Sequence, residues 1–379
     1  MIIMKRRDFI KTTAAAGFAT VLGEGKFADL SEKRNSDDIT YKSLPLWRGF
    51  NLQEKFTHKP DEWLDIAPEW GFSNEPFRES DFAAISELGF NFVRLPMSYK
   101  CWCEENDWYK LKEKHLREID QAVEWGKQYG LHVCINFHRS PGYTINDVVF
   151  KPQYKEKTSI WDDEETLKAC AFHWKHFAER YKGIPNSRVS FNLFNEPTGT
   201  TEEKHDRVIR YLVNEIRSVD QNRLIAIDGF NFSPSQTLAD LKIAQCARGY
   251  TPGVVTHYKA AWAFSPLSTF PTWPMKDNNG ELWDKSRLEK HFQPWKDIEN
   301  KGIGVYVGEF GVYNQTPHDV TLAFLKDNLD IWKDNNWGYA MWCFRGSFGV
   351  ADSGRKDVKY ENFKGLKLDR KMVELLRPV

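Results

Sequence analysis

Short β-branched or aromatic runs alternate with longer amphipathic segments along almost the whole chain. This alternation is typical of repeated βα units and of a parallel sheet. Eight strands separated by helices favour a closed barrel over an open sheet, which usually has fewer strands. The sequence therefore predicts an α/β fold, a (β/α)8 TIM barrel that forms a single catalytic domain. The expected strands are 47–53, 91–96, 132–138, 189–195, 224–228, 253–257, 304–310 and 339–344.

The N-terminal segment does not fit this pattern. Arg6 and Arg7 precede a small apolar run, and together they resemble a twin-arginine export signal. The run is too short for a transmembrane helix, so no membrane span is expected. We expect a signal and leader over residues 1–30, a polar spacer over 31–44 and the barrel over 45–379. The protein would then be exported, either to a periplasm or out of the cell.

Charge and cysteine content exclude several classes of protein. The 53 basic and 53 acidic residues leave no formal net charge. Nucleic-acid-binding proteins need a basic surface, so no nucleic-acid partner is expected. The six cysteines form no regular disulfide framework and lack the spacing and histidine partners of a zinc site. We expect reduced thiols and no metal at Cys101, Cys103, Cys134, Cys170, Cys246 and Cys343.

Aromatic residues are more frequent than a core of this size requires, with 15 Trp, 14 Tyr and 26 Phe. Flat aromatic faces stack on the C–H faces of sugar rings, while indole N–H groups reach hydroxyls, and we expect about a quarter of them to line a cleft. The long connections that follow the expected strands would build the active face of a barrel. These connections contain Trp63, Trp70, Trp102, Trp108, Trp161, Trp262, Trp273 and Trp283.

Six of the expected strands end in polar, ionisable or aromatic residues suited to a site. The C-terminal ends of the strands are where a barrel carries its catalytic groups. A single such residue more often anchors a loop, but their concurrence favours a site. The residues are Arg94, His138, Asn195 with Glu196, His257, Glu309 and Trp342.

Two of these residues, Glu196 and Glu309, end the fourth and seventh expected strands. Two carboxyl groups that face each other across a cavity can cleave a glycosidic bond in two steps. One must be protonated to release the leaving oxygen, and the other must stay ionised to attack the anomeric carbon. Asn195 can bind the sugar 2-hydroxyl, and Arg94 can keep Glu309 charged. The His and Glu residues show no close metal-ligand spacing, which makes a metal site a poor rival.

At this point a family resemblance is visible over nearly all of the chain after the leader. The sequence resembles glycoside hydrolase family 5, the cellulase-like retaining β-glycosidases of clan A. The resemblance implies double-displacement hydrolysis of a β-linked polysaccharide or oligosaccharide, in the manner of an endo-β-glucanase, by a monomer without a cofactor. The motifs are Arg94-Leu-Pro, Asn136-Phe-His138, Phe194-Asn195-Glu196-Pro197, His257-Tyr258, Gly308-Glu309-Phe310-Gly311 and Trp342.

The resemblance also implies roles for individual residues. Glu196 resembles the acid/base and Glu309 the nucleophile. The supporting residues would be Arg94, His138, Asn195 and His257, with Trp342 as the platform under a sugar. The family commonly has His-x-Tyr after strand six, and this chain has Lys259 where that tyrosine would stand. Either Tyr258 serves through a shifted loop, or the site is tuned for another substrate.

Three alternatives remain open at this stage. The substrate could be mannan or another β-glycan rather than glucan, because stacking aromatic rings suit any β-linked pyranose chain. An acceptor sugar could replace water, which would make the enzyme a transglycosylase. A barrel that only binds carbohydrate would be expected to lack one carboxylate, and here both are present.

Overall fold

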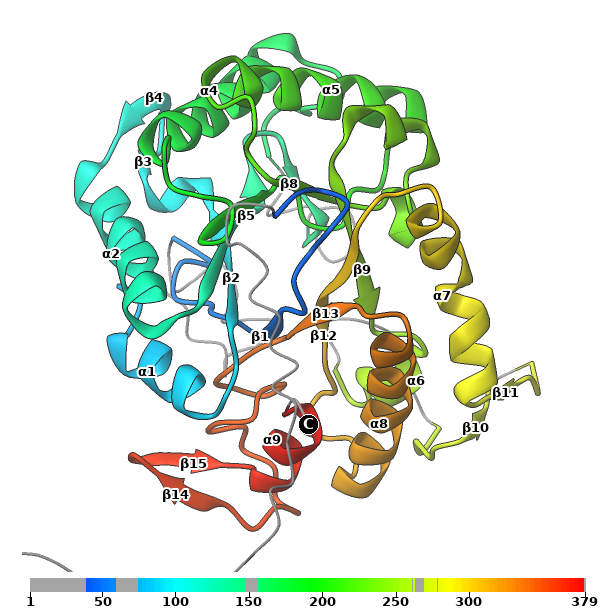
Figure 1. Cartoon of the computed structure of the whole chain (residues 1–379). Coiled ribbons are helices and arrows are strands. Elements are labelled where there is room, and N and C mark those ends of the chain that lie inside the picture. Colours follow the sequence, from blue (N-terminus) through cyan, green and yellow to red (C-terminus); the bar gives the residue numbers. More distant parts are fainter. Residues whose placement is uncertain are drawn as a thin grey trace, which may run out of the picture. The chain divides into compact units, whose positions relative to one another are not determined.

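The computed structural model describes residues 39–58, 74–146, 156–260, 262, 269–277 and 279–377. Within these ranges eight parallel strands close into a barrel, because β2 is hydrogen-bonded both to β1 and to β5 (Figure 1). This confirms the predicted (β/α)8 fold. The predicted export signal lies outside the described residues, as do Trp63 and Trp70. Around the barrel the strands are β1 (Arg48–Asn51), β2 (Phe92–Ser98), β5 (His132–Ser140), β7 (Val189–Asn192), β8 (Ile225–Asp228), β9 (Ala244–Gly249), β12 (Val305–Phe310) and β13 (Gly338–Met341).

Helices surround this barrel (Figure 1). The side chain of Asp163 caps the start of α4 by accepting a hydrogen bond from the backbone N–H of Thr166, and Gly130 ends α2 in the left-handed conformation. None of the helices in the described ranges is long and apolar enough to cross a bilayer. The helices are α1 (Glu79–Glu87), α2 (Glu113–Tyr129), α4 (Glu164–Arg180), α5 (Glu202–Val219), α6 (Gly253–Thr256), α7 (Lys285–Glu299), α8 (His318–Asp334) and α9 (Arg370–Leu376).

The loops contain 3₁₀ turns and short strands. The connection from β8 to β9 carries two 3₁₀ turns, η5 (Phe230–Phe232) and η6 (Gln236–Leu241), and η3 (Tyr99–Cys101) follows β2. The short strands are β3 (Cys103–Glu104), β4 (Asp107–Leu111), β6 (Tyr143–Thr144), β10 (Met275–Lys276), β11 (Leu282–Trp283), β14 (Glu361–Phe363) and β15 (Leu366–Leu368).

The position predicted for the sixth barrel strand is wrong. Residues 253–257 form the single helical turn α6 and its C-cap, whereas the strand is β9, which begins nine residues earlier in the chain, at Ala244. Its sequence, AQCARG, has little β propensity. Small residues are required there, because a Cβ added at Gly249 would come within 2.7 Å of the Phe310 side chain. Residues 244–249 therefore form a strand because they pack between β8 and β12, and not because of their own β propensity.

The lower half of the barrel interior is apolar. Phe92 points inward and stacks on Trp47 with ring centroids 4.9 Å apart, and Tyr306 meets Trp47 edge to face. Cys134 and Cys246 belong to the same cluster, and all six cysteines are buried and take part in no disulfide. The cluster is also covered from below by residues 39–44, which had been expected to belong to the spacer. This described part of the spacer contributes to the floor of the barrel.

The upper half of the interior is polar. Every second residue of a strand points inward, and in this half the inward-pointing residues are polar. On β2, Val93 and Leu95 pack outward in the main core, whereas Arg94 is fully buried and bonds to polar groups of neighbouring strands. Asn51 of β1 and Asn192 of β7 accept hydrogen bonds from Arg94. The strands thus carry an apolar layer below and a polar layer above it.

Candidate active site

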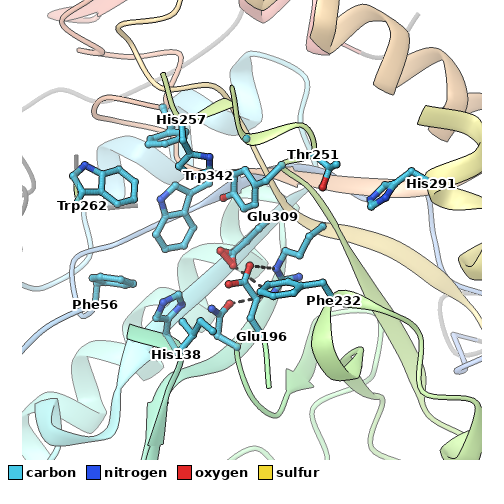
Figure 2. A pocket seen from close by; sticks show the side chains of 16 residues that line it. Phe56, His138, Glu196, Phe232, Thr251, His257, Trp262, His291, Glu309 and Trp342 are labelled. Carbon is cyan, nitrogen blue, oxygen red and sulfur yellow. Dashed lines mark hydrogen bonds and ion pairs between the residues drawn. The ribbon is translucent and has the colours of Figure 1, made fainter. Parts of the chain in front are cut away.

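A cavity of about 390 Å³ opens at the C-terminal ends of the strands (Figure 2). Six of the eight predicted site residues line it, and Arg94 supports it from below through Glu309 and Asn195. The predicted residues in the lining are His138, Asn195, Glu196, His257, Glu309 and Trp342.

Glu309 reaches this cavity through an irregularity in β12. Tyr306 points into the barrel and Val307 packs outward, so strict alternation would turn residue 309 outward as well. The pairing of β12 with β9 shifts register between Val307 and Glu309, and such a bulge redirects the next side chain. At Gly308 an added Cβ would lie 2.1 Å from the sulfur of Cys246, so only glycine fits beside this shift.

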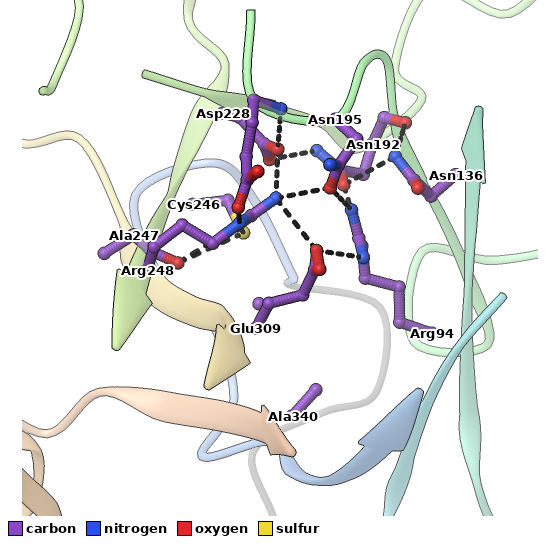
Figure 3. Close-up of polar contacts among 12 residues, drawn as sticks. Arg94, Asn136, Asn192, Asn195, Asp228, Cys246, Ala247, Arg248, Glu309 and Ala340 are labelled. Carbon is purple, nitrogen blue, oxygen red and sulfur yellow. Dashed lines mark hydrogen bonds and ion pairs between the residues drawn. The ribbon is translucent and has the colours of Figure 1, made fainter. Parts of the chain in front are cut away.

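Two guanidinium groups hold the carboxyl group of Glu309 (Figure 3). Its Oε2 accepts a hydrogen bond of 3.0 Å from Arg94 and lies 3.4 Å from a terminal nitrogen of Arg248. Burial raises the pKa of Glu309 above its ordinary value, and the positive charges of Arg248 and Arg94 oppose that rise. The two arginines therefore favour an ionised Glu309.

Arg94 fixes several side chains at once. It donates hydrogen bonds to Asn192 and Asn51, both at 2.9 Å, to Glu309 at 3.0 Å and to Asn195 at 3.1 Å. Two guanidinium groups, those of Arg94 and Arg248, hold the side-chain oxygen of Asn195. The amide nitrogen of Asn195 is therefore the group that can donate to a sugar hydroxyl.

Glu196 follows β7 in a left-handed conformation, with φ of 47°. Its backbone N–H donates to Asp228 at 2.8 Å, and its carbonyl oxygen accepts from the hydroxyl of Tyr143 at 2.6 Å. These bonds hold the backbone in a conformation that non-glycine residues rarely adopt. Burial, followed by the charge of Glu309, raises the pKa of Glu196 to about 7. Glu196 can therefore carry a proton near neutral pH.

Arg248 and Asp228 complete the charged layer, and neither was predicted. Arg248 donates to Glu196 at 3.0 Å through Nε, and its NH2 group forms a short ion pair with Asp228 (Figure 3). The layer then holds two arginines, Arg94 and Arg248, and three acidic side chains, including Glu309. One proton among the three carboxyl groups makes it neutral. The only sequence signal for Arg248 was an arginine inside a run of small residues, which is a weak one.

His138 and Trp342 form one wall of the cavity. Their rings stack with centroids 5.5 Å apart, and Phe56 lies edge-on to Trp342 and tilted on His138. Burial and the nearby arginines Arg94, Arg139 and Arg248 keep the pKa of His138 well below its ordinary value. The imidazole is therefore neutral and can exchange hydrogen bonds with a sugar.

Tyr258 does not line the cavity. It is half-buried, packs on Phe270, and lies under the ammonium group of the exposed Lys259. Tyr250, directly after β9, lines the cavity instead, and burial with the charges of Glu309 and Glu196 raises its pKa well above the ordinary value. The prediction placed this tyrosine wrongly because it placed the start of the sixth strand nine residues too late, at residue 253 rather than at Ala244.

His257 does line the cavity, although it caps the turn α6 rather than a strand. Its Nδ1 lies 2.9 Å from the hydroxyl of Thr256, and its ring contacts Tyr250 and Trp262. Burial lowers the pKa of His257 to about 4, so the imidazole is neutral at physiological pH.

The loop tryptophans mostly serve the core. Among the described ones, Trp262 lines the cavity, and the others pack elsewhere. Phenylalanines take much of the expected role, since Phe56, Phe232 and Phe348 contribute to the lining. The position of a tryptophan in a loop did not predict whether its ring lines the cleft or packs in the core. Long loops over a barrel also bury aromatic rings. The tryptophans packed in or against the main core are Trp102, Trp108, Trp161, Trp273 and Trp283.

In this closed (β/α)8 barrel a buried glutamate on β12 and a partly exposed glutamate after β7 lie beside aromatic rings. This is the architecture of a glycoside hydrolase. Comparison with known families agrees with this class. The profile of the cellulase family, glycosyl hydrolase family 5, matches residues 46–347, and the chain belongs to this family. It is therefore a glycoside hydrolase that cleaves β-linked glycans.

Individual relatives support the assignment. Endoglucanase C of Acetivibrio thermocellus is 28% identical over 323 residues, which cover 76% of this chain and 92% of that protein. A crystal structure described as a glycoside hydrolase is 33% identical, with a TM-score of 0.79 over 87% of this chain and 98% of that chain. Cel5A of Thermotoga maritima, solved with mannotriose, has the same fold, with 22% identity, a TM-score of 0.68 and coverage of 89% and 98%.

Proposed function

We propose that this protein is a retaining endo-β-1,4-glucanase, with Glu309 as nucleophile and Glu196 as acid/base. The observation that carries the roles is the unequal electrostatic environment of the two carboxyl groups. Glu309 is paired with both Arg94 and Arg248, whereas Glu196 is paired with Arg248 alone. Burial and the charge of Glu309 raise the pKa of Glu196 to about 7. The substrate class is supported by the endoglucanase relatives, of which Endoglucanase C is 28% identical.

In the first step the ionised Oε2 or Oε1 of Glu309 attacks the anomeric carbon of a sugar that rests on Trp342. The bond from that carbon to the glycosidic oxygen breaks, and Glu196 gives its proton to the departing oxygen. The amide nitrogen of Asn195 donates to the sugar 2-hydroxyl, a contact that strengthens in the transition state. A glycosyl ester on Glu309 and a free sugar hydroxyl result.

In the second step Glu196 acts as a base. The ester on Glu309 carries no charge, so the repulsion that helped to hold the proton on Glu196 has gone while Arg248 remains. Glu196 then takes a proton from water, whose oxygen attacks the anomeric carbon and releases Glu309. The configuration is inverted twice and so is retained overall.

Azide separates the two roles experimentally. Glu309→Ala with azide in the vacated space should give a glycosyl azide of inverted configuration. Glu196→Ala, on a substrate with a good aryl leaving group, should still form the glycosyl-enzyme, and azide should release it with retained configuration. NMR of the products would show the two outcomes, and the reverse pairing would mean that the roles are exchanged. An inverted product from the wild type would disprove double displacement.

Activity on a panel of β-glucan, xyloglucan, mannan and xylan tests the substrate. We expect the highest kcat/KM on β-1,4-glucan, with internal cleavage that lowers viscosity before reducing ends accumulate. Mannan is the rival substrate, since the structural relative Cel5A was solved with mannotriose. A clear preference for mannan would overturn the glucanase proposal and leave the mechanism intact.

We further propose that the protein is exported through its twin-arginine signal. The support is the pair Arg6 and Arg7 ahead of a short apolar run. Replacing both arginines by lysine should retain the protein in the cytoplasm, as fractionation and immunoblotting would show. Unchanged export of the double variant would refute this location.

A further inference from the structure

Asp228 is a buried carboxyl group that the two catalytic steps leave without a role. It is the last residue of β8, and 2% of its surface is exposed to solvent. Glu196 and Glu309 belong to the described residues that line the cavity, whereas Asp228 does not. A buried carboxyl group costs stability unless its partners compensate for it. Any function of Asp228 must therefore act through a neighbouring residue.

Three donors point at the carboxyl group of Asp228. Its Oδ1 accepts a hydrogen bond of 3.0 Å from the side-chain amide of Asn192. Its Oδ2 accepts from the backbone N–H of Glu196 at 2.8 Å and forms the short ion pair with Arg248 (Figure 3). A protonated carboxyl group would need an acceptor for its O–H, and these three partners are all donors. They therefore fit a carboxylate at Asp228.

The side chain of Glu196 is bound differently. Within the described residues its carboxyl group accepts one hydrogen bond, from Nε of Arg248 at 3.0 Å. Two positive charges, those of Arg94 and Arg248, are balanced by two carboxylates, and Asp228 and Glu309 have the stronger sets of donors. Glu196 is then the third carboxyl group, which keeps the layer neutral by carrying a proton.

The same count holds after the first step. The ester on Glu309 carries no charge, so the two arginines are then balanced by Asp228 and an ionised Glu196. The layer is neutral in the free enzyme when Glu196 holds the proton, and neutral in the glycosyl-enzyme after Glu196 has released it. Asp228 supplies the negative charge that is constant through both steps.

Other groups around Glu196 do not change this balance. Burial lowers the pKa values of His138, His257 and His291, so these imidazoles are neutral at physiological pH. For Glu196, burial and the charge of Glu309 raise the pKa, Asp228 adds to the rise, and Arg248 opposes it. The titratable and charged groups that surround Glu196 are Glu309 on β12, Arg248 on β9, Asp228 on β8, Tyr250 after β9, Tyr143 on β6, the three histidines and, through Asn195, Arg94 on β2.

This inference rests on the roles assigned to the two glutamates in the proposed function. We propose that Asp228 is a positioning residue that makes Glu196 the proton carrier, by neutralising Arg248 and by anchoring the backbone N–H of Glu196. The anchor also holds the left-handed backbone of Glu196, whose φ is 47°. Asp228 touches neither the sugar nor the departing oxygen.

Asp228→Asn tests the charge, because the amide oxygen can still accept the N–H of Glu196. The alkaline limb of kcat/KM, which reports the proton on the acid, should move down by about one pH unit. The loss on cellotetraose should then be about 5-fold at pH 7 and less than about twofold at pH 5.5. The acidic limb should move the same way, since the charge of Asp228 also raises the pKa of Glu309.

A substrate that needs no proton separates this effect from damage to the fold. On dinitrophenyl β-cellobioside, the burst rate of glycosyl-enzyme formation by Asp228→Asn at pH 7 should stay within about twofold of wild type. An unshifted alkaline limb would overturn the proposal. Equal losses at every pH and on both substrates would overturn it as well, because Asp228 would then only support the structure.

The double variant Asp228→Asn/Arg248→Gln covers the case in which the single variant does not fold. It removes one charge of each sign, so the layer is again neutral with a proton on Glu196, and the alkaline limb should lie near that of wild type. A limb that is about one unit lower in this double variant would contradict the charge balance.

Asp81→Asn is the matched control. Asp81 is also buried, with 1% of its surface exposed, and is ion-paired with an arginine, Arg345, but neither residue lines the cavity. Both limbs should stay in place in this variant, and a shift like that of Asp228→Asn would overturn the proposal. Exchanged azide products of the two glutamate variants would instead refute the proposed roles, whatever the profile of Asp228→Asn.

Discussion

The lower and upper halves of the barrel interior come from the same strands but have opposite chemistry. Below, Phe92, Tyr306 and Trp47 pack ring against ring without charge. Above, Arg94 and Arg248 hold buried acids in a layer that is neutral only when it carries one proton. Apolar burial stabilises the fold directly, whereas buried ion pairs recover little beyond their desolvation cost. The lower half thus supplies rigidity on which the upper half can be arranged for catalysis.

The largest effect is expected in the upper half. Glu309→Gln removes the nucleophile and should lower kcat by about 10⁴-fold or more. The folded state should survive, because Glu196 can ionise and restore neutrality beside Arg248. Steady-state kinetics and thermal unfolding measure the two quantities. A variant that retains activity, or one that loses its cooperative unfolding transition, would contradict this division between the halves.

The lower half should respond in the opposite way. Phe92 is fully buried and contacts Trp47, His132 and Tyr306. Phe92→Ala should reduce the free energy of unfolding by about 3–5 kcal/mol through lost burial and a residual cavity. Denaturant titration measures this loss. The rate per folded molecule at 20 °C or so should stay within about twofold of wild type, and a large drop in that rate would show that the two halves are coupled.

A pH experiment sharpens the comparison. Because burial raises the pKa of Glu196 from 4.5 to about 7, the folded protein keeps a proton that the unfolded chain releases in that window. The stability linked to this proton is fully present below pH 4.5 and is lost as the pH rises through 7. Glu196→Gln removes the dependence, so its Tm relative to wild type should increase by ~4 °C between pH 4.5 and pH 8. A constant Tm difference across this range would contradict the raised pKa.

The smallest effect is expected at the cavity wall above both layers. Trp342→Ala should lower kcat/KM by about 10-fold, because one stacking ring under the sugar is lost. Its side chain packs on Phe56 and His138 rather than in the main core, so the unfolding transition should remain. Parallel kinetics and melting curves make the check. Loss of the transition would place Trp342 among the residues that hold the fold.

Much of the architecture was determined by the sequence itself. Alternating periodicities are local signals, and they predicted a barrel and seven of its eight strands. Glu196 and Glu309 stood out because they end apolar runs, and strand ends gather at one face of a barrel. Spacing alone also predicted that the six cysteines do not pair with one another.

The remainder depended on tertiary contacts between distant segments. β9 is a strand because β8 and β12 pair with it, although its own residues do not favour that conformation. The same error hid Arg248 and Tyr250, and it misassigned Tyr258. Glu309 faces the cavity only because a register shift against β9 redirects it. Strand pairing, bulges and side-chain burial depend on contacts between elements that are far apart in the chain. Local periodicity in the sequence therefore cannot predict them.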